Sequence, residues 1–374
     1  MSPDTLRKAG VGIALADEAG VLKFRDSSSE EVVKSKDGVA ATIPEADTNG
    51  FIERQKIRDL RTEIRAELRA ESRSQSLQEV VAEAIKNLKP INVERIIPWS
   101  PVDEESRSLV VALGDFHYGS EFTVCGLDGD CLNLYNPATF EQRMGNLLVQ
   151  LEEIIEKEKI NTVEVMLVGD LIDGMLRDSQ LMRLKYGIVD STIHLSEYLA
   201  VWLTRLSSYV SVVKVHACTG NHSEIRPLGS KARQFEEENM ERIIMWYLQE
   251  RLKVHPNIII NPNTNRRVLA KVQGYNFLLL HGDGASYKNI SDIARDTVNL
   301  YGTPIDFFVC GHLHNEVTMQ SGMTKDGRSY IVRVPSLCGV DCYAQSKELG
   351  GQPGAVAMVI EKGYGRKCVY PISL

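Results

Sequence analysis

The segment SLVVALGDFHYG, residues 108–119, joins an apolar run to a turn that carries an aspartate and a histidine. A short apolar run that ends in Gly-Asp predicts a buried β-strand followed by a turn, because glycine permits positive φ and aspartate caps turns and helices. The same arrangement returns four times further along the chain: VEVMLVGD (163–170), SVVKVHACTGNH (211–222), NFLLLHGD (276–283) and FFVCGHLH (307–314). The sequence therefore predicts five buried strands, each ending in polar residues.

Amphipathic helices are predicted between these strands. In NPATFEQRMGNLLVQLEEIIEKEK (136–159), we expect Asn136 to be the N-cap and Pro137 the first helical residue. One face of this segment is apolar: Phe140, Met144, Leu147, Leu151 and Ile154. STIHLSEYLAVWLTRLSSYV (191–210) and ARQFEEENMERIIMWYLQERLK (232–253) share the pattern. Strands that alternate with helices predict a layered α/β core, in which loops at the carboxyl ends of the strands form the ligand crevice.

Composition places the chain among ordinary globular proteins, since its 374 residues are 43% hydrophobic and 25% charged. The net charge of −7 supplies no global basic field that would attract DNA or anionic lipid. No apolar stretch reaches the roughly 18 residues of a membrane span, and the N-terminus lacks the pattern of a secretory signal. The seven cysteines show no repeated metal-binding spacing, which favours free thiols in a reducing compartment. We therefore expect a cytoplasmic protein that does not contact a membrane.

The region before the first strand differs from the rest of the chain. Within residues 51–88, apolar side chains recur every three or four positions, which predicts an amphipathic helix. This helix either packs on its own domain, or mediates self-association into a homo-oligomer, or contacts nucleic acid through its arginines. The expected regions are a weakly ordered N-terminal segment (1–50), the amphipathic helix with a proline-marked linker (51–95), and a globular domain (96–374).

The polar residues at the five strand ends are nitrogen and oxygen donors. Five of the eight histidines follow an apolar run, whereas His194, His216 and His255 lie in predicted helices or within a strand and are interpreted as structural. Aspartate, asparagine and histidine together suit manganese, iron, zinc or magnesium in open hydrolytic sites. The donors are too many for one tetrahedral ion, and two ions about 3.5–4 Å apart that share one carboxylate would use the whole set. Residues two apart in an extended segment point to one face, so His312 and His314 can serve neighbouring ions.

The chain resembles the calcineurin-like metallophosphoesterase superfamily in five ordered motifs: GDFHYG, GDLID, GNHSE, HGD and GHLH. The resemblance covers residues 108–345 and implies an α/β fold, a layered αββα sandwich, here preceded by an N-terminal helical extension. The chain is also similar to a phage- and prophage-borne branch that is often labelled DNA repair exonuclease-like. Three segments carry this narrower resemblance: ERIIMWYLQERL (241–252), PSLCGVDCYAQS (335–346) and CVYPISL (368–374).

The resemblance implies a role for each donor. It assigns Asp115, His117 and His314 to a first ion and Asn221, His281 and His312 to a second, with Asp170 bridging the two. His222 would be the catalytic residue that contacts the phosphate and gives a proton to the leaving oxygen. Two divalent metal ions are the implied cofactors, with manganese expected first and zinc, iron or magnesium as alternatives.

Two acids beside the motifs have supporting interpretations. Asp173 stands where the nuclease branch of the superfamily often has histidine, and we expect it to support a ligand or cap a helix rather than to bind an ion. Glu224 is expected to orient His222 or to cap a turn. The text DGML at this point lacks the Arg-Gly pair of the protein phosphatase branch, so protein phosphatase activity is not expected.

Substrate contacts are less specific in the sequence. Arg226 and Lys288 either bind substrate phosphate or are solvated surface charges. A hairpin predicted within 120–137 either covers the site, together with Tyr118, or is a surface decoration.

These features predict a dinuclear metal-dependent phosphoesterase. In the first interpretation it is a phosphodiesterase that cleaves nucleic acid or nucleotides by attack of a hydroxide bridging the two ions. Acting on nucleic acid, it would be a nuclease. A phosphomonoesterase or cyclic-nucleotide hydrolase on the same site is one alternative, and a non-catalytic metal-binding scaffold is another. The narrower resemblance also implies a phage-encoded enzyme that acts in the host cytoplasm.

Overall fold

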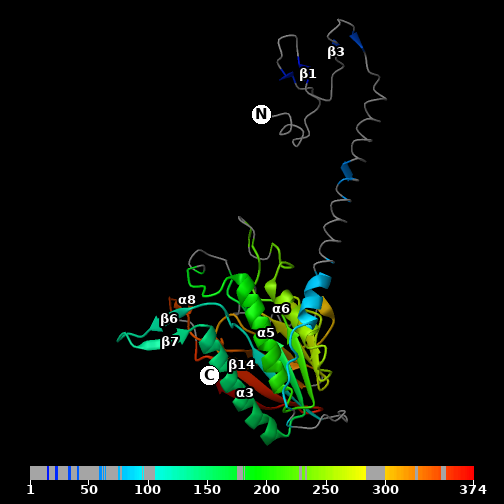
Figure 1. Cartoon of the computed structure of the whole chain (residues 1–374). Helices are drawn as coiled ribbons and strands as arrows, with labels where there is room; N and C mark the ends of the chain where they lie inside the picture. The colour runs from blue at the N-terminus through cyan, green and yellow to red at the C-terminus, as the bar shows by residue number, and fades with distance from the viewer. Residues whose placement is uncertain are drawn as a thin grey trace. The chain divides into compact units, whose positions relative to one another are not determined.

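The structure is a computed structural model of the chain (Figure 1), and it describes most residues from 78 onward. The described ranges are 78–94, 96, 106–174, 180, 182–226, 230–231, 234–283, 300–324, 327–346 and 351–374, with scattered positions before 78. The chain divides into two compact units, Met1–Glu79 and Val80–Leu374. In the first unit, the described residues include two short antiparallel pairs: β1 (Leu15–Ala16) with β2 (Leu22–Lys23), and β3 (Val33–Lys34) with β4 (Ala40–Ala41). Most of the predicted segment 1–50 and much of the predicted helix 51–88 lie outside the described residues.

The opening segment of the sequence forms a central strand of a six-stranded sheet in the second unit. The strand order is β10-β9-β8-β5-β16-β17. The first four strands are parallel to one another, whereas β16 is antiparallel to β5 and β17 is antiparallel to β16. The bounds are β5 (Arg107–Leu113), β8 (Thr162–Leu167), β9 (Val212–Ala217), β10 (Ile258–Ile260), β16 (Gly354–Glu361) and β17 (Gly365–Ser373). Three of the five predicted strands are therefore confirmed as parallel neighbours, β5, β8 and β9.

The other two predicted strands belong to a five-stranded sheet with the order β11-β12-β13-β15-β14. Its middle strands β12, β13 and β15 are parallel, and its edge strands are antiparallel to their neighbours. The bounds are β11 (Arg267–Val272), β12 (Tyr275–Leu280), β13 (Phe307–Cys310), β14 (Val317–Thr324) and β15 (Gly327–Arg333). Each sheet thus presents the carboxyl ends of three or four parallel strands along one edge.

The two sheets share one apolar layer. Val110 and Met166 of the six-stranded sheet pack in the same buried cluster as Phe277, Phe307 and Val332 of the five-stranded sheet. The Phe277 and Phe307 rings are stacked, with centroids 4.3 Å apart and planes 8° apart. Alternate residues of each strand enter this layer, because successive side chains of a strand point to opposite faces.

Helices cover the opposite face of the six-stranded sheet (Figure 1). They are α3 (Pro137–Glu158), α5 (Ile188–Leu206) and α6 (Met240–Arg251). The side chain of Asn136 accepts a hydrogen bond from the Thr139 N–H at 3.0 Å, so the predicted N-cap of α3 is confirmed. The predicted apolar face of α3 is buried, and the Trp202 indole of α5 donates to the Met144 carbonyl at 2.9 Å.

The α/β fold class is confirmed, with a helical layer and two sheets. Residues 284–299, between β12 and β13, lie outside the described residues. The predicted hairpin is present as β6 (Phe122–Cys125) and β7 (Cys131–Tyr135), which project from the body in Figure 1. The helical assignment of His255 is wrong, because α6 ends at Arg251 and His255 follows in a loop. Within the described ranges, every helix is too short or too polar to span a bilayer.

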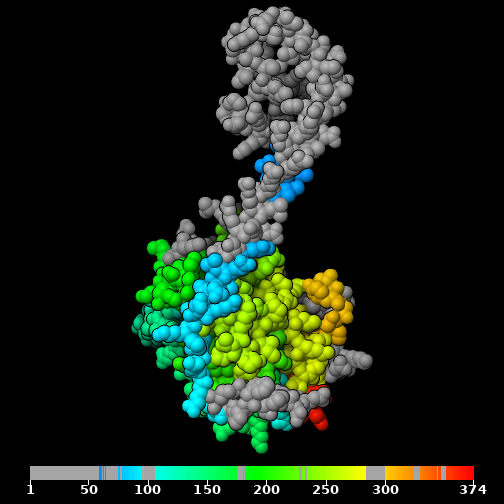
Figure 2. Space-filling view, turned by 45° about the vertical axis from the view of Figure 1, so that its right-hand side comes forward, coloured from blue at the N-terminus to red at the C-terminus, as the bar shows by residue number. Residues whose placement is uncertain are grey.

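The residues directly after 80 pack on the second unit beside α6, where they form the light-blue band of Figure 2. Ile85 is 5% exposed, and the Arg251 guanidinium of α6 donates to the Lys89 carbonyl at 2.8 Å. The Ile96 N–H donates to the Ser208 carbonyl at 3.2 Å. This stretch is therefore part of the surface of the sandwich unit.

Candidate metal centre

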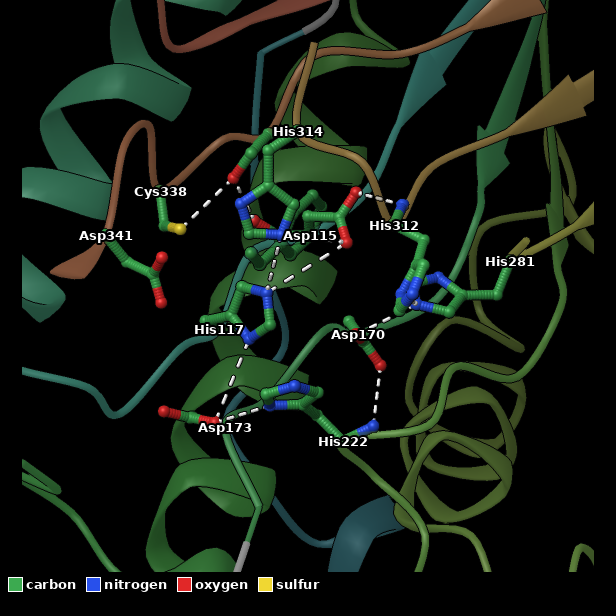
Figure 3. A network of polar contacts seen from close by, with 12 residues as sticks. Asp115, His117, Asp170, Asp173, His222, His281, His312, His314, Cys338 and Asp341 are labelled. Carbon is green, nitrogen blue, oxygen red and sulfur yellow. Dashed lines mark hydrogen bonds and ion pairs between the residues drawn. The ribbon is translucent and has the colours of Figure 1, made fainter. Parts of the chain in front are cut away.

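The residues that follow the parallel strands of both sheets meet in one place (Figure 3). The six-stranded sheet contributes Asp115 and His117 after β5, Asp170 and Asp173 after β8, and Asn221 and His222 after β9; the five-stranded sheet contributes His281 after β12 and His312 and His314 after β13. The loops also bind each other through the backbone, since the Asp115 N–H donates to the Gly169 carbonyl and the His117 N–H to the Asp170 carbonyl, both at 3.0 Å.

Backbone conformation distinguishes the expected ligands from most of the chain. Among the described residues, seven other than glycine have positive φ, and five of these are expected ligands: Asp115 (50°), His117 (46°), Asp170 (53°), His312 (71°) and His314 (58°). The left-handed region costs most residues about 1 kcal/mol or more, and such strain concentrates at functional sites. Glycine is required beside them, because a Cβ on Gly220 would lie 2.1 Å from the Asp170 nitrogen. Gly220, which precedes Asn221, thus permits a close approach of two loops.

One cluster of donors is formed by Asp115, His117 and His314. The Nε2 atoms of His117 and His314 are 3.4 Å apart, and His314 Nε2 is 3.5 Å from Asp115 Oδ1. The other carboxylate oxygen, Asp115 Oδ2, accepts the His312 N–H at 2.9 Å. Asp115 is fully buried, yet its Oδ1 has no hydrogen-bond partner among the described residues. A buried carboxylate oxygen left without a donor is costly, so it indicates a bound cation.

A second cluster lies around Asp170. Its Oδ2 is 2.9 Å from His281 Nε2, and His281 Nε2 is 3.2 Å from His312 Nδ1. The opposite ring nitrogen of His281 lies 2.8 Å from the Val168 carbonyl, which sets the tautomer in which Nε2 offers a lone pair. Asn221 Oδ1 is also buried without a partner in the described structure. Asp170 Oδ1 accepts a hydrogen bond from the backbone N–H of His222, the residue after Asn221, at 2.7 Å. The loop that carries Asn221 is therefore bonded directly to Asp170.

The carboxylates give the site a strong negative potential. Burial lowers the pKa of His281, but the adjacent Asp170 carboxylate outweighs burial and raises this pKa to about 10. Burial likewise opposes protonation of His117, but Asp173 raises its pKa to about 9. Burial also opposes the ionisation of Asp170, yet His281 holds its pKa well below the ordinary value. Cations are therefore attracted to the site, and metal ions that bind there must displace protons from the imidazoles.

His222 lies beside these clusters and is partly exposed. Its side chain is 24% exposed, against 8% for His117. Its Nδ1 is 2.7 Å from Asp173 Oδ1, and Asp173 also accepts from Ser120 Oγ and from the Gln180 amide at 3.1 Å. The second ring nitrogen, Nε2, has no hydrogen-bond partner among the described residues. Asp173 thus orients the imidazole so that Nε2 is available to an incoming group.

Glu241 supports the site from behind and was not singled out in the sequence. It is fully buried at the start of α6, and its carboxylate accepts the Leu171 N–H at 2.8 Å, the Gly220 N–H at 2.6 Å and the Ser223 hydroxyl at 2.9 Å. These donors belong to the loops after β8 and β9. Burial, followed by the charge of Asp170, raises the pKa of Glu241 to about 7. Its sequence context, NMERII, is that of an ordinary amphipathic helix and carries no signal of this role.

Arg226 and Glu224 lie at the rim of the site. Glu224 accepts from Arg226 Nε at 2.8 Å, and Arg226 Nη2 donates to the Asn221 carbonyl at 3.5 Å. The guanidinium is therefore next to an expected ligand loop.

The expectation of a substrate contact by Tyr118 is wrong. Its side chain is 2% exposed and packs in the helical-layer core, with its ring 5.1 Å from that of Phe140 and 6.4 Å from that of Tyr186. The ring is buried because it packs against aromatic side chains in the apolar layer beneath α3. Lys288, for which a substrate contact was one of two alternatives, lies outside the described residues.

The donor set suits divalent cations. Three groups each place three candidate ligand atoms within 4.8 Å of one another: His117, His314 and Cys338; His117, Asp170 and His222; Asp170, His281 and His312. Imidazole nitrogens and carboxylate oxygens are ligands for zinc, iron and manganese, and the unpartnered oxygens of Asp115 and Asn221 are the atoms that such ions would satisfy. Cys338 is a member that the sequence did not indicate, since cysteine spacing carried no metal motif.

Known proteins resemble this chain. The family model of the calcineurin-like phosphoesterases matches residues 108–316. The SPbeta prophage-derived uncharacterized protein YonJ of Bacillus subtilis (strain 168) is 30% identical over 319 residues, which are 85% of this chain and 76% of that protein. Among solved structures, a novel archaeal phosphodiesterase is 12% identical with a TM-score of 0.35, over 71% of this chain and 99% of its own. A dimetal phosphatase from Danio rerio is 10% identical with a TM-score of 0.36, over 71% and 98% of the two chains.

Proposed function

Since the chain belongs to the calcineurin-like phosphoesterase family, we propose that its clustered donors hold two divalent metal ions and that it hydrolyses phosphodiester bonds in nucleic acids or nucleotides. The observation that carries this proposal is the meeting of donors from both sheets. His281 Nε2 lies 2.9 Å from Asp170 Oδ2, and His314 Nε2 lies 3.5 Å from Asp115 Oδ1. Each pair joins a loop of one sheet to a loop of the other.

The two clusters supply a ligand set for each ion. Asp115, His117 and His314 would hold the first ion, Asn221, His281 and His312 the second, and Asp170 would bind both. When bound, a pair of divalent ions polarises the phosphoryl oxygens and brings the ionisation of a water molecule near neutral pH. The buried, cross-bonded loops keep the ligands in place, so little reorganisation is needed when charge develops on the phosphoryl group.

His222 is the residue that would assist the leaving group. Its Nδ1 is held by Asp173, and its Nε2 can give a proton to the departing alkoxide oxygen. Asp173 in turn is held by Gln180 and Ser120, so the imidazole has a defined orientation. Proton donation matters most for sugar alkoxides, which are poor leaving groups in the absence of an acid.

Among the described residues at the rim, the charge of Arg226 is offset by Glu224, which favours a diester over a monoester. Arg226, the basic side chain beside Asn221, is already paired with Glu224 at 2.8 Å. A phosphodiester carries one negative charge, whereas a monoester dianion calls for more cationic partners. The resemblance of the chain to a phage-borne exonuclease-like branch, and its likeness to a prophage-derived protein, support nucleic acid in a host cytoplasm as the setting. A monoesterase or a cyclic-nucleotide hydrolase remains the competing activity on the same site.

A metal-by-substrate panel tests the proposal. The full chain would be assayed with Mn²⁺, Zn²⁺, Fe²⁺ or Mg²⁺ against bis-p-nitrophenyl phosphate, single- and double-stranded DNA, RNA, cyclic nucleotides and monoesters. We expect metal-dependent cleavage of diesters that is absent from an Asp170→Asn protein purified in the same way, which controls for contaminating nucleases. Cleavage confined to monoesters would refute the diesterase proposal. If no metal supports hydrolysis of any substrate, a non-catalytic scaffold is favoured.

A further inference from the structure

A buried thiol lies at the cluster of Asp115, His117 and His314. The Cys338 Sγ and one ring nitrogen from each of His117 and His314 lie within 4.8 Å of one another. Cys338 is 0% exposed, and Figure 3 shows its side chain on the same side of the centre as His314. The sulfur therefore belongs to the lining of the centre.

The loop after β15 holds this thiol in place. The Cys338 N–H donates to the Asp115 carbonyl at 3.2 Å, and the Ser336 hydroxyl donates to the same carbonyl at 3.0 Å. The Asn133 amide of the hairpin donates to the Cys338 carbonyl at 2.9 Å. The backbone of Cys338 is thus bonded directly to the backbone of an expected metal ligand, which fixes its side chain beside that ligand.

The spacing of the neighbouring donors suits a common metal ion. His117 Nε2 and His314 Nε2 are 3.4 Å apart, and they lie 4.0 and 3.5 Å from Asp115 Oδ1. Ligand atoms about 2.1 Å from a tetrahedral ion lie about 3.4 Å from one another. These three atoms can therefore occupy three corners, and Asp115 Oδ1 is the buried oxygen with no partner in the described structure. The Cys338 sulfur lies near one ring nitrogen of each imidazole and is placed to join this ligand set.

The other buried cysteines give a comparison. Cys218 packs between the two sheets and Cys310 on the outer face of the five-stranded sheet, and within the described residues neither belongs to a group of candidate ligands. Cys338 also contacts the core, and its Sγ lies 3.1 Å from Ser336 Oγ. Among these three buried thiols, only that of Cys338 lies near two imidazole nitrogens in the described structure.

We propose that Cys338 is a sulfur ligand of the ion held by Asp115, His117 and His314. Binding would release the thiol proton to solvent and leave a thiolate on the ion. Sulfur favours zinc, iron(II) or cobalt(II) over magnesium and manganese, so the first ion site is selective for softer metals while the second, with oxygen and nitrogen donors, is not. This inference rests on the two-ion centre of the proposed function and does not depend on which substrate is cleaved.

Cobalt(II) spectroscopy on the full chain tests the proposal, because thiolate coordination produces an intense near-ultraviolet charge-transfer band. We expect this band in the parent protein and its loss in Cys338→Ser, while the weaker visible bands of bound cobalt remain. Cys342→Ser is the matched control from the same segment and should keep the band. The Cys338→Ser protein should also bind zinc about 10- to 100-fold more weakly, with manganese binding changed less than about threefold.

A second measurement needs no variant. X-ray absorption at the zinc edge of the parent protein should show a sulfur ligand at about 2.3 Å. Stoichiometric zinc or cobalt binding with only nitrogen and oxygen ligands would overturn the assignment, even where hydrolysis is normal. Conversely, a sulfur signal in a protein that cleaves no phosphoester would support the ligand and refute the proposed function.

Discussion

The two sheets contribute differently to the centre. The loops of the six-stranded sheet supply all of its expected carboxylates, Asp115, Asp170 and Asp173, together with His222. The loops of the five-stranded sheet supply imidazoles and a thiol. They contact the loops of the six-stranded sheet: His281 Nδ1 is 2.8 Å from the Val168 carbonyl, and the His312 N–H donates to Asp115. On the proposed function, the first sheet would set the charge and the proton transfer, and the second would tune which ion binds and how tightly.

The largest expected effect is that of Asp170→Asn on the six-stranded side. It removes the charge expected to bind both ions, so we expect the rate of diester cleavage to fall about a thousandfold and excess metal not to restore it. Steady-state kinetics over a range of metal concentrations measure this. Full recovery at high metal would mean that the six-stranded side has no special role.

His222→Asn separates proton transfer from ion binding. The rate on a dinucleotide should fall about a hundredfold or more, since a general acid contributes that much. The rate on bis-p-nitrophenyl phosphate should change little, because nitrophenolate leaves without a proton, and the metal content should stay the same. Equal losses on both substrates, or a loss of metal, would show that His222 is a ligand instead.

His312→Asn probes the five-stranded side, and asparagine tolerates the left-handed backbone found there, with φ of 71°. We expect metal affinity to fall about 100-fold, with most of the activity restored by excess metal. Calorimetric titration and a metal-activation curve give the two values. If activity stays lost at saturating metal, His312 does more than bind metal, and the proposed difference between the two sheets is wrong.

Asp173→Asn should cost about 10- to 100-fold in rate, since it orients His222 without binding substrate. The loss should again be larger for the dinucleotide than for the nitrophenyl ester. An identical loss for both esters would point to damage at His117, whose Nδ1 lies 3.8 Å from Asp173 Oδ1.

The smallest effect concerns Glu241, which holds only loops of the six-stranded sheet. Its pKa of about 7 in the folded protein lies above the ordinary 4.5, so the folded state favours the protonated form. Its contribution to stability is therefore greatest at low pH and falls as pH rises from about 4.5 to 7, by at most roughly 3 kcal/mol. Urea unfolding of metal-free parent and Glu241→Gln proteins at pH 5 and 7.5 should show a steeper decline in the parent, because His117 and His281, whose pKa values are also raised, contribute a decline to both proteins. The same pH dependence in both would remove Glu241 as its source.

Much of the centre could be predicted from the sequence, because each ligand directly follows an apolar run that forms a strand. Parallel strands bring their carboxyl ends to one edge, so the local pattern of Asp115, Asp170 and His281 was enough to expect them together. Cys338 could not be predicted in this way. Its place depends on β15 lying beside β13, and no local spacing of cysteines reports that neighbour relation.

Residues whose environment depends on packing were also beyond the sequence. Glu241 follows the helix N-cap Asn239, where an acidic residue normally faces solvent, but the packing of α6 turns it onto two loops. Tyr118 stands among the motif residues, yet its side chain points to the other face of the loop and packs with Phe140. At both positions the role of the residue depends on where its side chain points, and tertiary contacts determine that direction.

Anomalous diffraction from a crystal of the metal-loaded protein tests the central claim most directly. Two peaks about 3.5–4 Å apart are expected, one near Asp115 and His314 and one near His281 and His312, with the Asp170 carboxylate touching both. A single ion, or ions bound away from these loops, would contradict the joint two-ion centre.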